Sequence, residues 1–344
     1  MIPPSLRVAI VGSTTFKGKE LADVLRERKF PARDIRLLDD EALGKLESLG
    51  DEVTFVQKVG AEQLQNVDVV FLASEEKVSR QQWTTIQPSG AAVIDLSYGL
   101  ETESGARLRA PWIDRELGRL FMPELQPAPV VVAHPAAVVL ALVLLRAQKA
   151  GRVRMAAATV IEPASERGRS GMDELHEQTV SLLSFHQLPK QIFDAQVAFN
   201  LISRYGTNAQ PPLETVERRI AAHYAAITGG EAPTPALMLL QGPSFHSHAF
   251  SIFLEMESAV SLEGMGAALQ GEHLEVVPET ESEDAPSPVS AAGKDDLQVS
   301  VRQDRERPQA FWLWVAADNL RTAAINAVEC AGNMIPALPT GTVQ

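Results

Sequence analysis

The feature that most constrains the fold is a short apolar run near the N-terminus that ends in glycine and leads into a helical pattern. Residues 8–11 read VAIV, Gly12 follows them, and apolar residues then recur at helical spacing at Leu21, Val24 and Leu25. Further apolar runs alternate with polar or helical stretches, at residues 35–38, 69–72 and 92–94. This alternation is typical of βαβ units, so roughly the first 130 residues are predicted to form a doubly wound domain around a parallel sheet.

After residue 153 the pattern changes to longer strands with helices between them. Strands are predicted at residues 155–161, 236–240, 248–257, 297–302 and 311–315. Helices are predicted at residues 171–183 and 213–227. This order indicates an α+β second domain.

Two segments of this second part carry specific expectations. Residues 311–315 read FWLWV, so both faces of that strand are expected to be covered, one of them by a partner subunit. The alternative is cover by helices of the same chain. Residues 279–294 are rich in acidic residues, Pro, Ser and Ala, and are predicted to form a solvated loop.

The composition is that of a chain large enough for two domains. It has 344 residues, and a single hydrophobic core rarely grows beyond about 250–300 residues. The formal net charge of -13 disfavours nucleic acid and anionic membrane as partners, because phosphate would be repelled. The single cysteine, Cys330, excludes an internal disulfide and fits a reducing compartment.

Neither an export leader nor a membrane span is evident in the sequence. The most apolar stretch, residues 130–145, is interrupted by His134 and Pro135. It is too short to cross a bilayer comfortably and predicts a buried strand followed by a buried helix. We therefore expect a cytoplasmic protein.

A glycine-containing turn lies between the first predicted strand and helix. Its residues Gly12, Ser13, Thr14, Thr15 and Gly18 stand where a dinucleotide-binding fingerprint would lie. Taken alone, a glycine after a strand indicates only a turn. These five residues are the candidate cofactor-binding residues of the chain.

More specific motifs occur along the rest of the chain. Residues 318–328 read DNLRTAAINAV, residues 199–202 read FNLI and residues 291–295 read AAGKD. A further set of matching residues comprises Ser165, Gly168, Gly171, Glu174, Leu175 and Gln178. In this order the motifs resemble those of the aspartate-semialdehyde dehydrogenase family: DN-[IL]-RKGAA-x-NAV, FN-[VL]-I, AGKD and SGAG-x-x-G-x-x-EL-x-x-Q. Within that family the chain is similar to the bacterial Usg-type paralogues.

The resemblance implies both an architecture and a reaction. The expected fold is α/β, with a Rossmann-type doubly wound domain at residues 1–132 that is completed by a C-terminal helix at 318–340. Residues 133–317 would form the α+β domain for catalysis and dimerisation, and a homodimer is expected. The reaction of the family is the NADP-dependent reductive dephosphorylation of aspartyl phosphate through a cysteine thioester.

The cysteine nucleophile of the family is missing from its motif. The family places it in N-P-N-C-[ST], at the start of a helix, where the dipole favours a thiolate. Here residues 134–138 read HPAAV, so Ala137 stands at the nucleophile position. Cys330 lies in the closing helix and is predicted to be core packing. His134 is the alternative nucleophile.

The other chemical positions of the family are changed as well. His248 fills the position of the base and is expected to be a relict, a hydrogen-bonded core residue or an acid/base. Gln241 replaces the arginine that binds the substrate carboxylate, Glu162 replaces the active-site glutamine, and Glu101 replaces the phosphate-binding arginine. An acyl phosphate would therefore meet neutral or acidic groups in place of cationic donors. No metal site is expected.

The cofactor positions also depart from the family pattern. Asp39, Asp40 and Glu41 stand where NADP-binding members hold the 2′-phosphate, and acids there favour a ribose hydroxyl. Thr15 replaces the middle glycine of the fingerprint, and two glutamates at residues 75–76 replace a Gly-Gly pair. Each like-charge contact with a pyrophosphate would cost on the order of 1 kcal/mol. We expect no cofactor or weak binding of NAD, and we do not expect NADP.

These departures predict a catalytically inactive homologue that acts as a dimeric binding or regulatory protein. One alternative is an NAD(P)-dependent oxidoreductase of altered specificity that acts on an aldehyde or alcohol, with His248 as acid/base. Another is a regulatory subunit that pairs with a true dehydrogenase, a heteromeric partner that the sequence does not identify. Fold alone does not decide among them.

Overall fold

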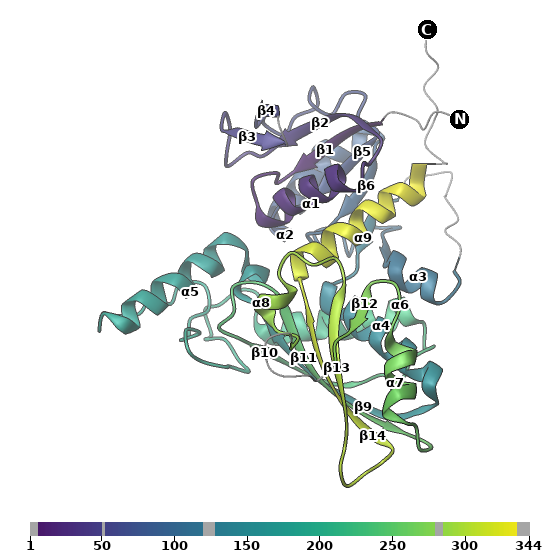
Figure 1. Ribbon diagram of the computed structural model, residues 1–344. Coiled ribbons are helices and arrows are strands. Elements are labelled where there is room, and N and C mark those ends of the chain that lie inside the picture. Colours follow the sequence, from purple (N-terminus) through teal and green to yellow (C-terminus); the bar gives the residue numbers. More distant parts are fainter. Residues whose placement is uncertain (1–5, 50–51, 120–127, 279–284, 336–344) are drawn as a thin grey trace. The chain divides into compact units, whose positions relative to one another are not determined.

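The computed structural model describes residues 6–49, 52–119, 128–278 and 285–335. It contains two compact units (Figure 1). The first comprises Met1–Ala133 and Ala323–Gln344, and the second comprises His134–Thr322.

The first unit is built around a six-stranded parallel sheet. Its strand order is β2-β1-β5-β6-β8-β7. The strands are β1 (Leu6–Val11), β2 (Ala32–Leu38), β5 (Val69–Leu72), β6 (Ala92–Asp95), β7 (Arg107–Arg109) and β8 (Val130–Val132). The helical elements are α1 (Phe16–Glu27), α2 (Glu76–Ile86), the 3-10 turn η1 (Gln87–Ser89) and α3 (Pro111–Glu116). The predicted doubly wound domain is confirmed.

The central strands of this sheet explain why the sequence signal was clear. Every residue of β5 and β6 is buried, as is most of β1. Parallel strands covered on both faces appear in sequence as uninterrupted apolar runs.

A two-stranded hairpin, β3 (Leu46–Leu49) with β4 (Glu52–Phe55), was not predicted. Leu46 and Phe55 are paired in it and both are exposed, so these two apolar side chains do not mark a buried face in the sequence.

The second unit contains a six-stranded mixed sheet. Its order is β10-β9-β11-β14-β13-β12. The strands are β9 (Val153–Glu162), β10 (Ala236–Gln241), β11 (His248–Met256), β12 (Leu274–Val276), β13 (Leu297–Gln303) and β14 (Ala310–Ala317). The helical elements are α4 (Pro135–Ala150), η2 (Ala164–Arg167), α5 (Gly168–Leu183), α6 (Leu213–Thr228), α7 (Leu262–Leu269) and α8 (Pro288–Ala291). The predicted α+β arrangement is confirmed.

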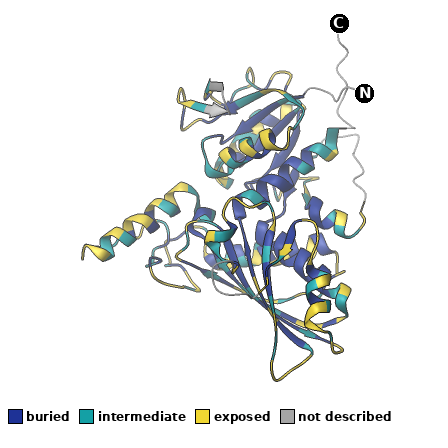
Figure 2. Ribbon diagram, viewed as in Figure 1, coloured by how far each residue is buried: buried dark blue, intermediate teal, exposed yellow. Residues whose placement is uncertain are grey.

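Helix α4 is the most buried helix of this unit (Figure 2). Every residue from Pro135 to Ala147 is buried, and the helix packs against α6 and α7. The buried Arg146 donates from Nη1 to the Leu269 carbonyl, at 3.2 Å, and from Nη2 to that of Glu272, at 2.7 Å. The predicted strand followed by a buried helix at 130–145 is confirmed.

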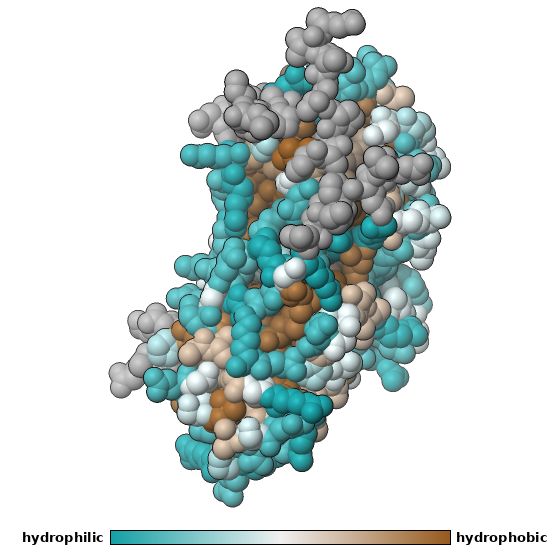
Figure 3. All heavy atoms as spheres, turned by 90° about the vertical axis from the view of Figure 1, so that its right-hand side faces the viewer, coloured by the Kyte–Doolittle hydropathy of each residue, from teal (hydrophilic) through white to brown (hydrophobic). Residues whose placement is uncertain are grey.

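No helix in the described part of the chain is long and apolar enough to span a membrane. The face drawn in Figure 3 is mostly hydrophilic.

Two expectations about the second unit need correction. On β14, Phe311, Leu313 and Val315 are buried, whereas Trp312 and Trp314 remain 38% and 37% exposed. The alternative, that helices of the same chain cover these two side chains, is therefore wrong, and cover by a partner subunit stays a prediction. The segment predicted as a loop contains the short helix α8, which a capping box between Ser287 and Ser290 begins. Residues 279–284 of that segment lie outside the described residues.

The last helix is α9 (Asn319–Met334), the predicted closing helix. Asp318 precedes it, and its carboxylate accepts hydrogen bonds from the Arg321 backbone N–H at 2.9 Å and from that of Gly293 at 2.7 Å. The helix start is therefore capped and tied to the loop that follows α8. Residues 336–340 of the predicted helix lie outside the described residues.

Two motif residues of α5 fix a neighbouring loop. The Glu174 carboxylate accepts from three successive backbone N–H groups, of residues 191 to 193, at 2.5 to 3.1 Å. The Gln178 side chain accepts from the backbone N–H groups of Val197 and Ala198 and donates to the carbonyls of Pro189 and Ala195. These residues therefore stabilise the fold of the loop, and their presence says nothing about catalysis.

Candidate functional site

The glycine turn of the first unit keeps the backbone that such a turn requires. Gly12 has φ +80°, and a Cβ atom there would lie 2.4 Å from the Ser74 backbone nitrogen. A Cβ atom on Gly18 would lie 2.2 Å from the Gly12 carbonyl oxygen. Thr15 Oγ1 donates to the carbonyls of Gly12 or Ala73, both at 2.8 Å, and accepts from the Gly18 N–H at 3.0 Å. Thr15 is thus the N-cap of α1 and is turned toward its own loop.

Asp39, at the end of β2, is tied to the same turn. Its Oδ2 accepts from Thr14 Oγ1 at 2.6 Å, and its Oδ1 accepts from the Glu41 N–H at 3.0 Å. The side chain is buried. This is the position from which an acid would bind ribose hydroxyls, but the hydroxyl of Thr14 already occupies one of its oxygens.

Charges beside the turn are more balanced than the sequence indicated. Glu76 forms an ion pair with Arg80, one helical turn later, at 2.8 Å. Lys17 in the first turn of α1 donates to the Leu96 carbonyl at 3.3 Å, and its Nζ lies 4.9 Å from the centre of the Tyr98 ring. The sequence analysis considered the negative charges of residues 75–76 but not the positive charge of Lys17. The repulsion expected for an anion here is therefore smaller than predicted.

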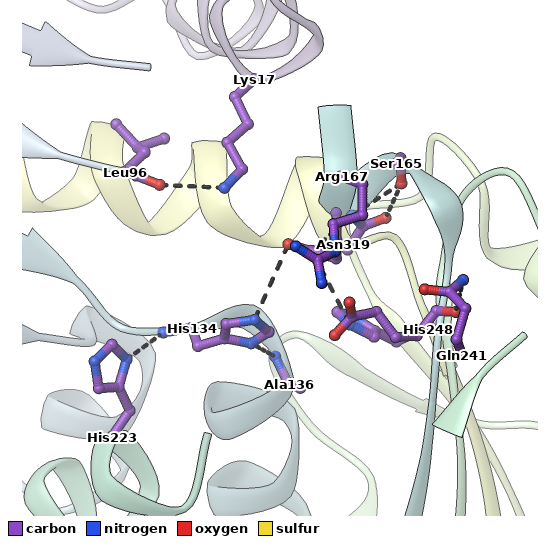
Figure 4. Close-up of polar contacts among 12 residues, drawn as sticks. Lys17, Leu96, His134, Ala136, Ser165, Arg167, His223, Gln241, His248 and Asn319 are labelled. Atoms are coloured by element: carbon purple, nitrogen blue, oxygen red, sulfur yellow. Dashed lines mark hydrogen bonds and ion pairs between the residues drawn. The ribbon is translucent and has the colours of Figure 1, made fainter. Parts of the chain in front are cut away.

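In the second unit, Ala137 lies in the first turn of α4. His134 directly precedes that helix, and its side chain lies beside Ala136 (Figure 4). Ala137 is completely buried. His134 is the N-cap: its Nδ1 accepts from the Ala136 N–H at 3.2 Å, and its backbone N–H donates to His223 Nδ1 at 2.9 Å. An Nδ1 that accepts cannot carry a proton, so the proton of the neutral ring is on Nε2. The His134 ring is therefore a hydrogen-bond donor at Nε2.

Glu166 lies between His134 and His248. Its Oε2 is 4.0 Å from His134 Nε2, and its Oε1 is 4.0 Å from His248 Nε2. The side chains of Glu166, His134 and His248 are only 6%, 2% and 0% exposed. Asn319, the first residue of α9, donates from Nδ2 to Glu166 Oε1 at 2.8 Å and accepts at Oδ1 from the Ser247 N–H at 3.1 Å.

Gln241 and Glu162 meet at the ends of the paired strands β10 and β9. The Gln241 amide donates to the carbonyls of Glu162 and Gly242, at 2.9 and 2.8 Å. Its Oε1 accepts from the Tyr205 hydroxyl at 2.6 Å. Burial and the nearby Glu162 carboxylate raise the pKa of Tyr205 well above its ordinary value. Both ends of Gln241 are therefore engaged within the chain.

Arg167 packs against the Tyr205 ring, with the guanidinium carbon 4.5 Å from its centre. Its Nη2 donates to the Pro211 carbonyl. The structure thus brings His134, His248, Gln241 and Glu162 into one unit, with their partners. Glu101 belongs to the other unit, at the turn after β6.

Sequence reasoning missed Glu166, Arg167 and Tyr205. A signal existed for two of them, because residues 166 and 167 stand where the SGAG pattern has small residues. No such signal exists for Tyr205.

No group of three or more potential metal ligands was found among the described residues. The Nε2 atom of His134 would have to lose its proton before it could bind a metal.

Cys330 is part of the first unit, in the C-terminal half of α9. It is buried, and burial raises the pKa of its thiol far above the usual value. A thiol in that state is not a nucleophile. Its packing role is as predicted.

Comparison with known proteins gives matches over nearly the whole chain. Residues 7–137 match the semialdehyde dehydrogenase NAD binding domain, and residues 144–322 match the semialdehyde dehydrogenase dimerisation domain.

Individual relatives agree with these matches. A USG-1 protein homolog of Pseudomonas aeruginosa is 31% identical, over 94% of this chain and 96% of the relative. An aspartate-semialdehyde dehydrogenase of Rickettsia bellii is 26% identical over 95% and 97%. The solved structure of a probable aspartate-semialdehyde dehydrogenase from Pseudomonas aeruginosa superimposes with a TM-score of 0.83 at 30% identity, covering 96% of this chain and 98% of that one.

Proposed function

Because the chain belongs to the semialdehyde dehydrogenase family, we propose that it is a dimeric member that does not perform thioester chemistry and acts by binding. One observation carries this proposal. The helix start at which the family pattern places its cysteine holds Ala137, whose side chain has no atom that can form an acyl intermediate. The single cysteine of the chain is buried in the other unit.

The contacts of Gln241 support the same proposal. The position that would bind a substrate carboxylate carries an amide instead of a guanidinium, and that amide already makes hydrogen bonds at both ends. A substrate carboxylate would have to break these bonds and would gain no charge-assisted pair.

We propose weak binding of NAD at most. The turn from Gly12 to Gly18 retains its shape, and Asp39 is the residue that would accept from ribose hydroxyls. A bound nicotinamide would supply hydride chemistry. Because Asp39 is already bonded to Thr14, the ribose would compete for its carboxylate. A 2′-phosphate beside Asp39 would be repelled, which disfavours NADP.

One observation favours a second candidate function. The Glu166 carboxylate lies 4.0 Å from His248 Nε2, so a buried acid stands near the imidazole at the position of the family's base. An NAD-dependent oxidoreductase acting on an aldehyde or alcohol without a covalent intermediate would use His248 in this way. That function predicts turnover with NAD that His248→Gln abolishes.

A homodimer is the assembly that we propose, as the dimerisation-domain match supports. Trp312 and Trp314 project from β14 on a sheet face that keeps them more than a third exposed, and an apolar face of that kind is normally covered. Light scattering at micromolar concentration should give twice the 37.3 kDa of one chain. A concentration-independent mass of one chain would contradict the dimer.

The decisive assay for the proposed function is NADP reduction with aspartate semialdehyde and phosphate, on protein repurified away from the host enzyme. We expect no turnover above background. Ala137→Cys is expected to stay inactive as well, because Gln241 and Glu162 remain. Family-level turnover by the unaltered chain would overturn the proposal, and turnover by the variant alone would show that the lost thiol was the only defect.

A further inference from the structure

We propose that the outer end of α5 forms a contact between two copies of this chain, in which each copy inserts Phe185 into a groove of the other. Figure 1 shows α5 projecting away from the sheet of its own unit. The last buried residue of the helix is Gln178, and none of the described residues from 179 to 185 is buried. The last turn of α5 and the residues that follow it are therefore accessible to another molecule.

The accessible end of α5 carries large apolar side chains. Val180 is 49% exposed, Leu183 is 70% exposed and Phe185, just after the helix, is 97% exposed. Phe185 also has φ +57°, a conformation that a bulky residue rarely adopts. Helices gain most of their stability from the packing of an apolar face, and exposed apolar patches commonly mark interaction surfaces. This helix end is therefore a surface that another apolar surface would cover.

A groove of about 510 Å³ lies beside these residues, between one face of α5 and the loop that follows the helix. Val180, Leu188 and Pro189 contribute apolar groups to its lining, and His176 lines it on the helix. The side-chain amide of Gln178 donates to the Pro189 carbonyl at 2.9 Å, which holds the loop against the helix. The groove is in the size range of sites that take small molecules, so it is large enough for a phenyl ring.

The arrangement of the apolar end and the groove identifies the occupant as a second copy of the chain. Both lie within residues 144–322, which match the dimerisation domain, so this inference rests on the proposed homodimer. With a rise of 1.5 Å per residue, Phe185 and His176 lie at roughly equal distances on either side of Val180. Two antiparallel α5 helices related by a two-fold axis at Val180 therefore place Phe185 of each copy at the groove of the other. Each contact forms twice in such a dimer.

The first test is the dimer dissociation constant, measured by sedimentation at several concentrations. Phe185→Asp should raise it by about 100-fold or more, because two buried phenyl rings are lost per dimer. The control is Leu43→Asp, which changes an apolar side chain that is 62% exposed in the other unit and should leave the constant unchanged. Circular dichroism should show the same fold in both variants. A Phe185→Asp variant that dimerises as tightly as Leu43→Asp overturns this contact and leaves the homodimer standing, whereas an unaltered chain that is monomeric contradicts both.

The second test is a cross-link at the proposed two-fold axis. The one native cysteine, Cys330, is buried, so Val180→Cys introduces the accessible thiol of the chain. A residue at a two-fold axis faces its own copy, and mild oxidation should give a covalent dimer on a non-reducing gel. Thr84→Cys, at an exposed position of α2, should stay at the mass of one chain, and adding Phe185→Asp to Val180→Cys should remove the cross-link. The proposal is overturned if Val180→Cys gives no more covalent dimer than Thr84→Cys.

Discussion

The glycine turn of the first unit differs from the histidine site of the second, which comprises His134, His248, Glu166 and Asn319. The difference is in which positions match the family pattern. In the turn, the residues at Gly12 and Gly18 still set the backbone, and Thr15 replaces a glycine by forming an N-cap. In the histidine site, Asn319 still accepts a hydrogen bond from the backbone N–H of Ser247, just before β11, whereas Ala137 and Gln241 stand where reactive or binding groups are expected. Positions that shape the backbone and positions that carry chemistry are thus separable within one chain.

Gly12→Ala should give the largest effect and tests whether the turn is as constrained as its geometry implies. The substitution combines a positive φ with a Cβ contact of 2.4 Å to backbone, so the free energy of unfolding should fall. A loss of about 3 kcal/mol is expected in urea denaturation. Gly90→Ala is the matched control, since Gly90 has φ +70° with no atom within 4 Å of an added Cβ, and it should lose only about 1 kcal/mol. Equal losses of stability in the two variants would show that the backbone shifts to relieve the contact between the added Cβ atom and Ser74.

Asn319→Ala should give the next largest effect, now in the frame of the histidine site. The variant removes the acceptor of the buried Ser247 N–H and the hydrogen bond that Asn319 donates to Glu166. Unfolding should become easier by about 2 kcal/mol. Asn333→Ala, an exposed position on the same helix, should stay within about 0.5 kcal/mol of the unaltered chain. A loss no larger than that of the control would mean that the frame does not depend on Asn319.

Thr15→Ala tests the cap that distinguishes the turn from a glycine fingerprint. Loss of the hydroxyl removes the acceptor of the Gly18 N–H, and chemical denaturation should show a loss of about 1 kcal/mol. The control is Thr84→Ala, whose exposed hydroxyl makes a local bond in α2 to Gln81. An unchanged stability in Thr15→Ala would show that the residue is tolerated without contributing.

The smallest effect expected is the preference between the two dinucleotides. Calorimetric titration should show NAD binding about threefold or more tightly than NADP, because the Asp39 carboxylate would repel a 2′-phosphate. Asp39→Ser should reduce this preference, and Asp34→Ser, which changes an exposed acid in the preceding strand β2, should leave it unchanged. Tighter binding of NADP than of NAD by the unaltered chain would refute the argument from Asp39.

The sequence alone determined the parallel sheet of the first unit, the main strands of the second and the absence of a thiol from residues 134–138. Apolar runs and a missing atom are local properties, and they can be recognised without coordinates. Only the tertiary structure placed the Glu166 carboxylate between His134 and His248, the hydroxyl of Tyr205 on Gln241, and the Trp312 side chain on an exposed face. These contacts join segments far apart in the chain, and their direction depends on strand register and helix caps that residue spacing does not fix.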